Sequence, residues 1–165
     1  MMKLGYIHGS KIKYNVPKVI EIPFTHNTDE TDTGIDLPPK ALVLDAFLYV
    51  ETADTGITIN VGTKSSESGG DADGFIAGAS VASTGLVPLG VTVTSGSSED
   101  YFSACTYGAK LADFTAGSDN AGDVGTYARK YYATDSATAK SITYTCSAGA
   151  DTAEGKIYLV ILELE

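Results

Sequence analysis

Residues 141–164 read SITYTCSAGADTAEGKIYLVILEL, and this stretch decides the fold class. Ile142, Tyr144 and Cys146 alternate with Ser and Thr, which is the two-residue period of a strand with one buried face. The last part, 156–164, is an almost continuous apolar run of residues that favour strands. Between the two, SAGADTAEG has the composition of a turn. The chain therefore ends in two predicted strands.

Similar patterns fill the first part of the chain. KVIEIPFT at 18–25 is predicted to be a strand, in which Pro23 indicates an edge or a bend. HNTDETDTGID at 26–36, which is rich in acids and turn formers, is predicted to be a loop. The run ALVLDAFLYVE at 41–51 and the alternating ITINV at 57–61 are predicted to pair as a β-hairpin.

The middle of the chain has a weaker periodicity. TKSSESGGDADG at 63–74 is predicted to be a polar loop, and FIAGASVASTG at 75–85 contains too many small polar residues to indicate one element type. LVPLGVTVT at 86–94 is predicted to be a strand. The stretch 95–98 then breaks it.

Two interpretations of residues 99–140 remain open. KLADFT at 110–115 and TYARKYYA at 126–133 are predicted strands around the loop AGSDNAGDVG. The rival prediction is a helix over 100–110. In either case the chain has about seven or more strands and no repeat, which favours a sandwich of two antiparallel sheets or a closed barrel.

The runs 41–50 and 157–164 are apolar on both faces, whereas an antiparallel strand with one wet face should alternate. Something must cover the second face. Overlying loops or a central position in the sheet would do so within one chain, and a subunit interface would do so between chains.

Composition excludes several classes of function. The chain has 165 residues and a formal net charge of −10, which disfavours nucleic acid as a partner. No apolar run approaches the roughly 18 to 20 residues that span a bilayer, and the N-terminus lacks the apolar stretch of a signal peptide, so we expect a cytosolic origin. Cys105 and Cys146 are too few for a disulfide framework and are expected to be free, buried thiols.

The charge is unevenly distributed. Residues 1–20 contain four lysines and no acid, a charge of +4, and the remaining chain carries −14. Basic and apolar residues alternate in this segment, which predicts an arm over residues 1–16 and a single domain over 17–165. The arm would dock on an acidic neighbouring subunit. The alternative is a solvated tail or a first edge strand.

Candidate chemistry is sparse. His8 and His26 have no partner pattern, and the acids Asp29, Glu30 and Asp32 beside His26 are expected to form a solvated loop rather than a metal or general-base site. The segment 71–74, DADG, resembles part of a calcium loop, but the other ligands are missing, so a turn is expected. There is no nucleophile elbow, phosphate loop or dinucleotide fingerprint.

Four of the ten tyrosines, Tyr127, Tyr131, Tyr132 and Tyr144, could line a carbohydrate groove or a protein interface. The alternative is that they are ordinary core and edge residues, as is common in a chain without tryptophan.

The order of motifs resembles a known family. TDTGIDLPPKALVLDAFLYVETA, ITINVGT, DADGFIAGAS and the closing SITYTCSAGADTAEGKIYLVILEL together are similar to capsid cement, or decoration, proteins encoded beside the major capsid gene of tailed bacteriophages. The resemblance covers roughly half of the chain. The stretch from about 95 to 140 is longer than in that pattern.

The resemblance implies an all-β, jelly-roll-like antiparallel β-sandwich with a short N-terminal arm, commonly trimeric, on the outer surface of the capsid. The expected function is to stabilise the capsid by bridging its subunits, with no enzyme activity and no cofactor or metal. The expected partners are the major capsid protein and further copies of the chain as a homotrimer, with no nucleic acid and no membrane. The protein would be made in the host cytoplasm and end in the virion. The predicted interface residues are Lys3, Leu4, Tyr6, Ile7, Lys11, Ile12, Lys13, Tyr14, Leu48, Val50, Tyr158 and Val160. The alternative is a carbohydrate- or receptor-binding β-sandwich of a virion fibre or tail.

Overall fold

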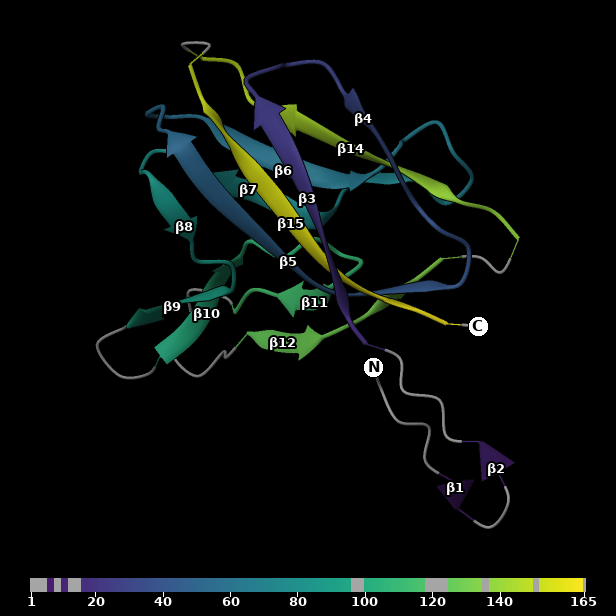
Figure 1. Cartoon of the computed structure of the whole chain (residues 1–165). Coiled ribbons are helices and arrows are strands. Elements are labelled where there is room, and N and C mark those ends of the chain that lie inside the picture. The colour runs from purple at the N-terminus through teal and green to yellow at the C-terminus, as the bar shows by residue number, and fades with distance from the viewer. Residues whose placement is uncertain are drawn as a thin grey trace.

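Nine of the described strands form two antiparallel sheets packed face to face (Figure 1). The computed structural model describes residues 6–7, 10–11, 16–95, 100–117, 125–134, 137–149 and 152–164, and these contain strands but no helix. The first sheet has the order β8/β13-β5-β15-β3, and consists of β3 (Lys18–Thr25), β5 (Ala41–Thr52), β8 (Gly85–Val87), β13 (Tyr132–Ala133) and β15 (Glu154–Glu163). The second has the order β7-β6-β14-β4, and consists of β4 (Thr31–Leu37), β6 (Thr58–Thr63), β7 (Asp71–Ser80) and β14 (Lys140–Cys146).

The connections between these strands are those of a jelly roll. From β3 to β6 each strand lies in the opposite sheet from the one before it, β6 and β7 pair with each other, and β8 returns to the first sheet. After an insertion, β14 joins the second sheet and β15 the first. The resulting strand orders, β3-β15-β5-β8 and β4-β14-β6-β7, interleave the two halves of the chain as in a double Greek key. The predicted all-β sandwich is confirmed.

One predicted pairing is wrong. Strands β5 and β6 were expected to form a hairpin, but they lie in different sheets, because β15, β8 and β13 occupy the edges of β5 while β14 and β7 occupy those of β6. The intervening turn passes from one sheet to the other. The carboxylate of Asp54 holds this turn by accepting hydrogen bonds from the amide and hydroxyl of Thr152, at 3.2 and 3.0 Å.

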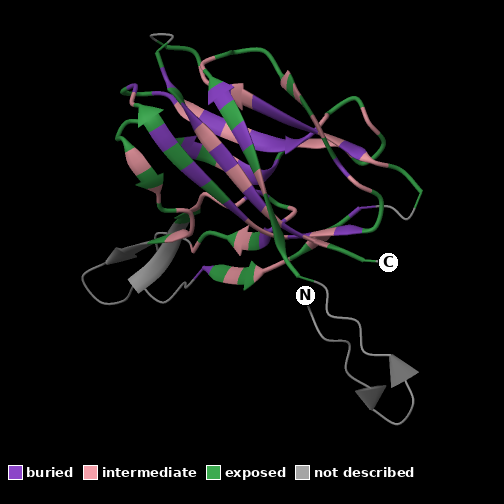
Figure 2. Ribbon diagram, viewed as in Figure 1, coloured by how far each residue is buried: buried purple, intermediate pink, exposed green. Residues whose placement is uncertain are grey.

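The core lies between the sheets, where the buried positions alternate along the strands (Figure 2). Ile157, Leu159 and Ile161 of β15 face inward. Ile142, Tyr144 and Cys146 of β14 face them from the second sheet, as the alternation over 141–146 predicted. The two cysteines are free; Cys146 is buried and Cys105 is partly buried.

The insertion between β8 and β14 closes one side of the sandwich. It contains the ribbons β9–β10 and β11–β12, which consist of β9 (Val91–Ser95), β10 (Asp100–Cys105), β11 (Ala112–Thr115) and β12 (Thr126–Arg129). The strands predicted at 110–115 and 126–133 are confirmed in large part, and the rival helix over 100–110 is wrong because 100–105 pairs as a strand. The strand predicted at 86–94 is divided into β8 and β9.

Two predicted loops contain strands. The acidic segment 26–36 includes most of β4, which pairs with β14 at the sheet edge. The predicted loop 63–74 overlaps the start of β7, so the DADG segment is part of a strand and is neither a calcium loop nor a turn. Near the N-terminus, β1 (Tyr6–Ile7) and β2 (Ser10–Lys11) pair with each other.

Candidate interaction surface

The side of the first sheet that faces away from the core is the candidate site. We call it the outer face; its apolar side chains are Val19, Phe47, Tyr49, Leu86, Tyr158 and Val160. The strand register brings these together: Tyr158 lies opposite Phe47, and Tyr49 lies opposite Leu86. Leu86 is 66% exposed, Tyr49 43% and Phe47 36%, so no element of the described chain covers them fully.

Two of the predicted interface residues are placed elsewhere. Leu48 and Val50 are fully buried in the core, because they alternate with Phe47 and Tyr49 along β5. The expectation that they form an interface is therefore corrected: the residues of β5 that reach the surface are their neighbours. Alternation along the strand correctly divides the residues of β5 into two faces. Because both faces are apolar, the sequence does not show which of them points into the core.

Tyr158 and Val160 do lie on the outer face, where both are half-buried. Val160 is opposite Val19 of β3, which is 63% exposed. The sequence reasoning missed Val19 and Leu86, because it looked for a second covered face only in the two runs that are apolar on both faces, 41–50 and 157–164.

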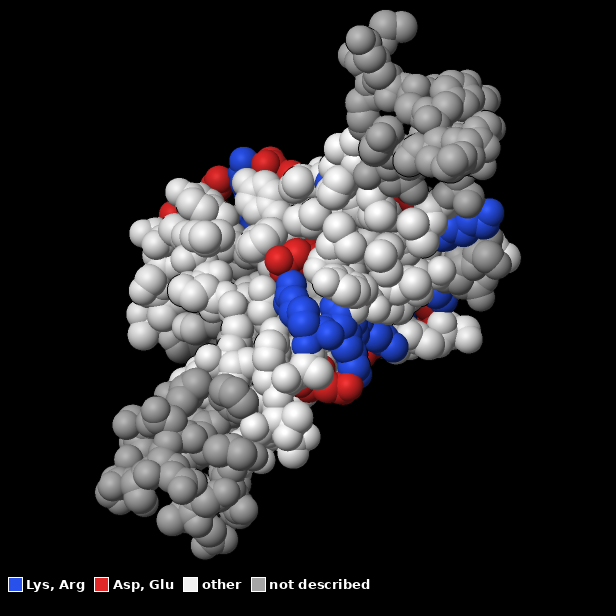
Figure 3. Space-filling view, turned by 90° about the horizontal axis from the view of Figure 1, so that it is seen from below, with Lys and Arg blue, Asp and Glu red and all other residues white. Residues whose placement is uncertain are grey.

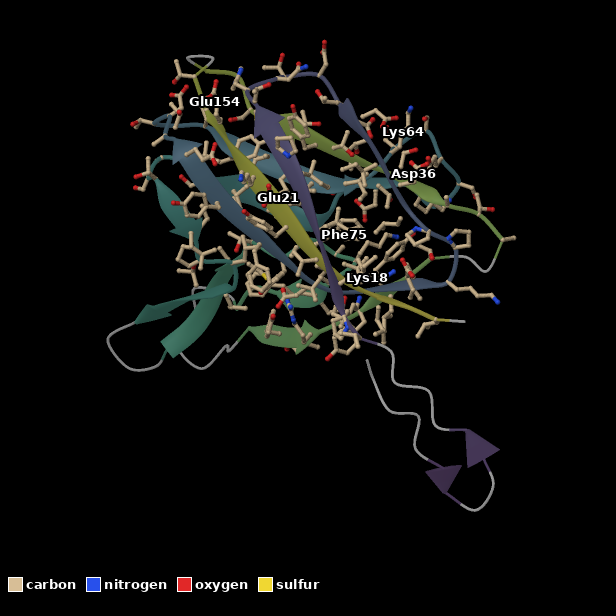
Figure 4. The ribbon with its side chains drawn as sticks, in the orientation of Figure 1. Lys18, Glu21, Asp36, Lys64, Phe75 and Glu154 are labelled. Carbon is tan, nitrogen blue, oxygen red and sulfur yellow. The ribbon has the colours of Figure 1, made fainter. Side chains whose placement is uncertain are left out.

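A polar network crosses the outer face. Lys156 Nζ lies 3.1 Å from Glu21 and 3.9 Å from Glu51, and so links β15 to the strands on both sides. Glu21 is labelled on β3 in Figure 4. Hydrogen bonds from Lys156 and from the Tyr158 hydroxyl hold the pKa of Glu21 below its usual value. This network fixes the Tyr158 ring among the apolar side chains while its hydroxyl is satisfied.

At the other end of β5, the insertion is tied to the sheet by a second polar cluster. Arg129 Nη2 donates to Asp45 Oδ1 at 2.6 Å, and the guanidinium lies 3.8 Å from the centre of the Tyr107 ring. Burial, and then the charge of Asp45, raise the pKa of Tyr107. The cluster positions β12 beside the outer face, and Arg129 Nη1 is buried there without a described partner.

The predicted arm is described only in part. Lys3, Leu4, Ile12, Lys13 and Tyr14 lie outside the described residues. Tyr6, Ile7 and Lys11 belong to the β1–β2 ribbon, which pairs with no other strand in the part of the chain that the structure describes.

The residues considered for metal or acid–base chemistry have structural partners. Glu30 accepts hydrogen bonds from Ser65 and Thr143, and Asp32 accepts one from Lys64 at 3.0 Å. These acids therefore tie the start of the edge strand β4 to β14 and to the segment that follows β6. Among the described residues no group of three or more His, Cys, Asp or Glu side chains could hold a metal ion. His8 lies outside them.

The four tyrosines considered for ligand binding are not brought together. Tyr144 packs in the core edge-on to Phe24, with ring centres 6.2 Å apart. Tyr131 is 62% exposed. Tyr132 lines an open polar cleft of about 770 Å³, and the charged side chains that line the same cleft are Glu67, Lys110 and Lys140.

Charged side chains also gather at the end of the sandwich beneath β5. Seen from that end, Lys and Arg form a cluster near the middle with acids on either side, and most of the remaining described surface is uncharged (Figure 3). Among the residues that the structure describes, no helix has the length and apolarity needed to cross a bilayer.

Comparison with known proteins found no matching family model, no matching curated protein and no matching solved structure.

Proposed function

We propose that the chain is a structural virion protein that binds the outer surface of a bacteriophage capsid and stabilises it by bridging capsid subunits. The observation that carries the proposal is the outer face, an apolar surface with two tyrosines and a phenylalanine on a sheet whose core is already complete. Aromatic side chains of this kind supply much of the binding energy of protein interfaces. The resemblance to cement proteins names the capsid as the partner.

Binding by many copies makes modest contacts sufficient. A protein that covers a shell in a regular array is held by several weak contacts at once, and each contact gains from the effective concentration set by the others. In this proposal the major capsid protein is the partner, and copies of the chain also contact one another as a homotrimer. The basic arm over residues 1–16 adds contacts to an acidic neighbour.

The test is co-sedimentation with capsids assembled from the major capsid protein of the same genome. The full chain should sediment with capsids at a fixed ratio. Tyr158→Ser should reduce the bound fraction on the order of tenfold, since it removes an aromatic contact near the centre of the outer face. Tyr131→Ser, an exposed tyrosine next to the short edge strand β13 and not one of the six side chains that define the outer face, is the matched control and should bind normally.

Removal of residues 1–16 should weaken binding further and make it less sensitive to salt. If the full chain does not sediment with capsids, the proposal is wrong. If both tyrosine variants bind like the unchanged chain, the outer face is not the contact.

The second candidate, a carbohydrate-binding module, is favoured by one observation, the polar cleft lined by Tyr132, Glu67 and two lysines. Carboxylate, ammonium and hydroxyl groups beside an aromatic ring are suited to sugar hydroxyls. Binding to a glycan array that disappears in Tyr132→Ala and persists in Tyr158→Ser would favour this candidate over the capsid.

A further inference from the structure

The backbone of residues 106–110 runs along the edge of β7 and lies very close to the backbone of that strand. The amide of Gly108 donates to the carbonyl of Phe75 at 3.0 Å, and the amide of Lys110 donates to that of Gly74 at 2.8 Å. A Cβ on Gly108 would lie 1.9 Å from the carbonyl oxygen of Asp73, so only glycine permits this approach.

A second glycine leaves room for the side chain of Lys110. A Cβ on Gly74 would lie 2.6 Å from Lys110 Cγ and 3.1 Å from Asp71 Cγ, so the lysine crosses β7 at Gly74 next to the Asp71 carboxyl group. Lys110 Nζ is 4.0 Å from Asp71 Oδ2, and these side chains are 31% and 25% exposed. The Tyr132 ring lies 5.7 Å from Nζ, and both side chains line the open polar cleft described above.

A second carboxyl group completes the cluster. Asp73 lies two residues after Asp71, on the same side of the strand, and the two side chains are hydrogen-bonded. That hydrogen bond and burial raise the pKa of Asp73. Because an adjacent carboxyl group favours the protonated form, Asp73 is better suited to donate a proton than an isolated aspartate is.

We propose that Lys110 Nζ and Asp71 Cγ become joined by an intramolecular amide bond, with Asp73 as the acid that assists the reaction. A nucleophile and an electrophile that the fold holds side by side react as if at very high concentration. The new bond would connect the insertion covalently to the second sheet.

The step balances without a co-reactant. Lys110 first gives one proton to the Asp71 carboxylate, and the neutral amine then attacks Cγ. The C–N bond forms, the C–O bond breaks, and the oxygen leaves as water with the proton gained from the ammonium and one supplied by Asp73. Asp73 recovers a proton from the nitrogen, so nothing is oxidised or reduced and only one water is lost.

A different ion pair provides an internal contrast. Lys64 Nζ lies closer to its acid, 3.0 Å from Asp32 Oδ2, but both side chains are 41% exposed. The amide of Gly34 and then Lys64 donate hydrogen bonds that hold the pKa of Asp32 below its usual value, which keeps it an ionised and unreactive carboxylate. No amide is expected there.

The test is mass spectrometry of the full chain under denaturing conditions. The intact mass should be lower than the sequence mass by about 18 Da, one water. The sequence has no Lys or Arg between residues 65 and 109, so trypsin should give a peptide over 65–129 that is uncut after Lys110 and carries the mass deficit. Lys110→Arg should restore the full mass, because a guanidinium does not form this amide. The control Lys64→Arg should keep the deficit.

Asp73→Ala should slow the appearance of the cross-link on the order of 100-fold, which is what loss of a positioned acid costs. A full sequence mass in the unchanged chain would overturn the proposal. So would a deficit that persists in Lys110→Arg, or one found in a peptide cut after Lys110, since both indicate a cyclic imide at Asp73–Gly74 instead. None of these outcomes bears on capsid binding.

Discussion

Neighbouring residues on β5 should respond to truncation in different ways. Leu48 is fully buried in the core, whereas Phe47 lies on the outer face and is 36% exposed. Leu48→Ala removes buried methyl groups and leaves a cavity, so it should lower the free energy of unfolding by about 3 kcal/mol, within the usual range of about 2–5. Phe47→Ala removes a ring that is only partly withdrawn from water and should cost about 1–2 kcal/mol.

Urea unfolding followed by far-ultraviolet circular dichroism measures both changes. For a chain of this length, the cost at Leu48 corresponds to a fall in Tm of roughly 6–12 °C. Capsid co-sedimentation of folded protein, well below the Tm, should show the reverse order: Phe47→Ala binds less and Leu48→Ala binds normally. If Leu48→Ala costs under about 1 kcal/mol, or less than Phe47→Ala, the assignment of inner and outer faces on β5 is refuted.

Three further predictions concern parts of the sandwich away from this pair. Arg129→Ala leaves the partly buried Asp45 without its partner and should destabilise the fold by about 1–3 kcal/mol in urea; no loss would show that the insertion is not held by this ion pair. Gly155→Ala places a Cβ 2.2 Å from the Tyr49 carbonyl oxygen, so it should cost about 1–3 kcal/mol by thermal unfolding, and an unchanged Tm would contradict the close packing of β15 on β5. Burial raises the pKa of Glu30, but hydrogen bonds donated by Ser65 and Thr143 outweigh burial, so the pKa is lowered overall. The stabilisation that ionised Glu30 gives the fold should therefore be present above the unfolded pKa of about 4.3 and be lost as the pH falls through the pKa of the folded state. Tm values of Glu30→Gln and the unchanged chain should therefore differ at neutral pH and converge in acid; a constant difference would count against this.

Strands with a clear period were predictable from sequence. In β15 inner and outer positions alternate with the pleat along the strand. In β14 the apolar residues Ile142, Tyr144 and Cys146 face the core as their two-residue spacing predicts, although Thr143 between them is also fully buried. The fold class follows from such strands, because enough of them joined by turns leave few arrangements.

Pairing partners and polar edge strands were not predictable. Strand β4 contains two aspartates and Gly34, and its place in the sheet depends on hydrogen bonds to β14, which lies far away in sequence. The hairpin expected between β5 and β6 failed for the same reason, since local alternation is equally compatible with a partner in either sheet.

The sequence predicted that a second apolar face exists, but not which residues form it. Apolar residues on both faces of β5 and β15 indicated a second covered surface, but the choice of Leu48 over Phe47 needed the orientation of the strand. The cluster of Lys110, Asp71 and Asp73 had no signal in the sequence, because the approach of the insertion to β7 is a tertiary contact.

The insertion also decides where other strands can be added to this molecule. On one side of the sandwich, residues 106–110 already bond to the edge of β7, and only the short strands β8 and β13 border β5. The other side ends in the longer edge strands β3 and β4. A sandwich with unpaired long edge strands on one side only can add a second copy there, edge to edge. The resulting pair then has no long edge strand left for a third copy. Strand addition between copies is thus self-limiting, which disfavours growth into fibres.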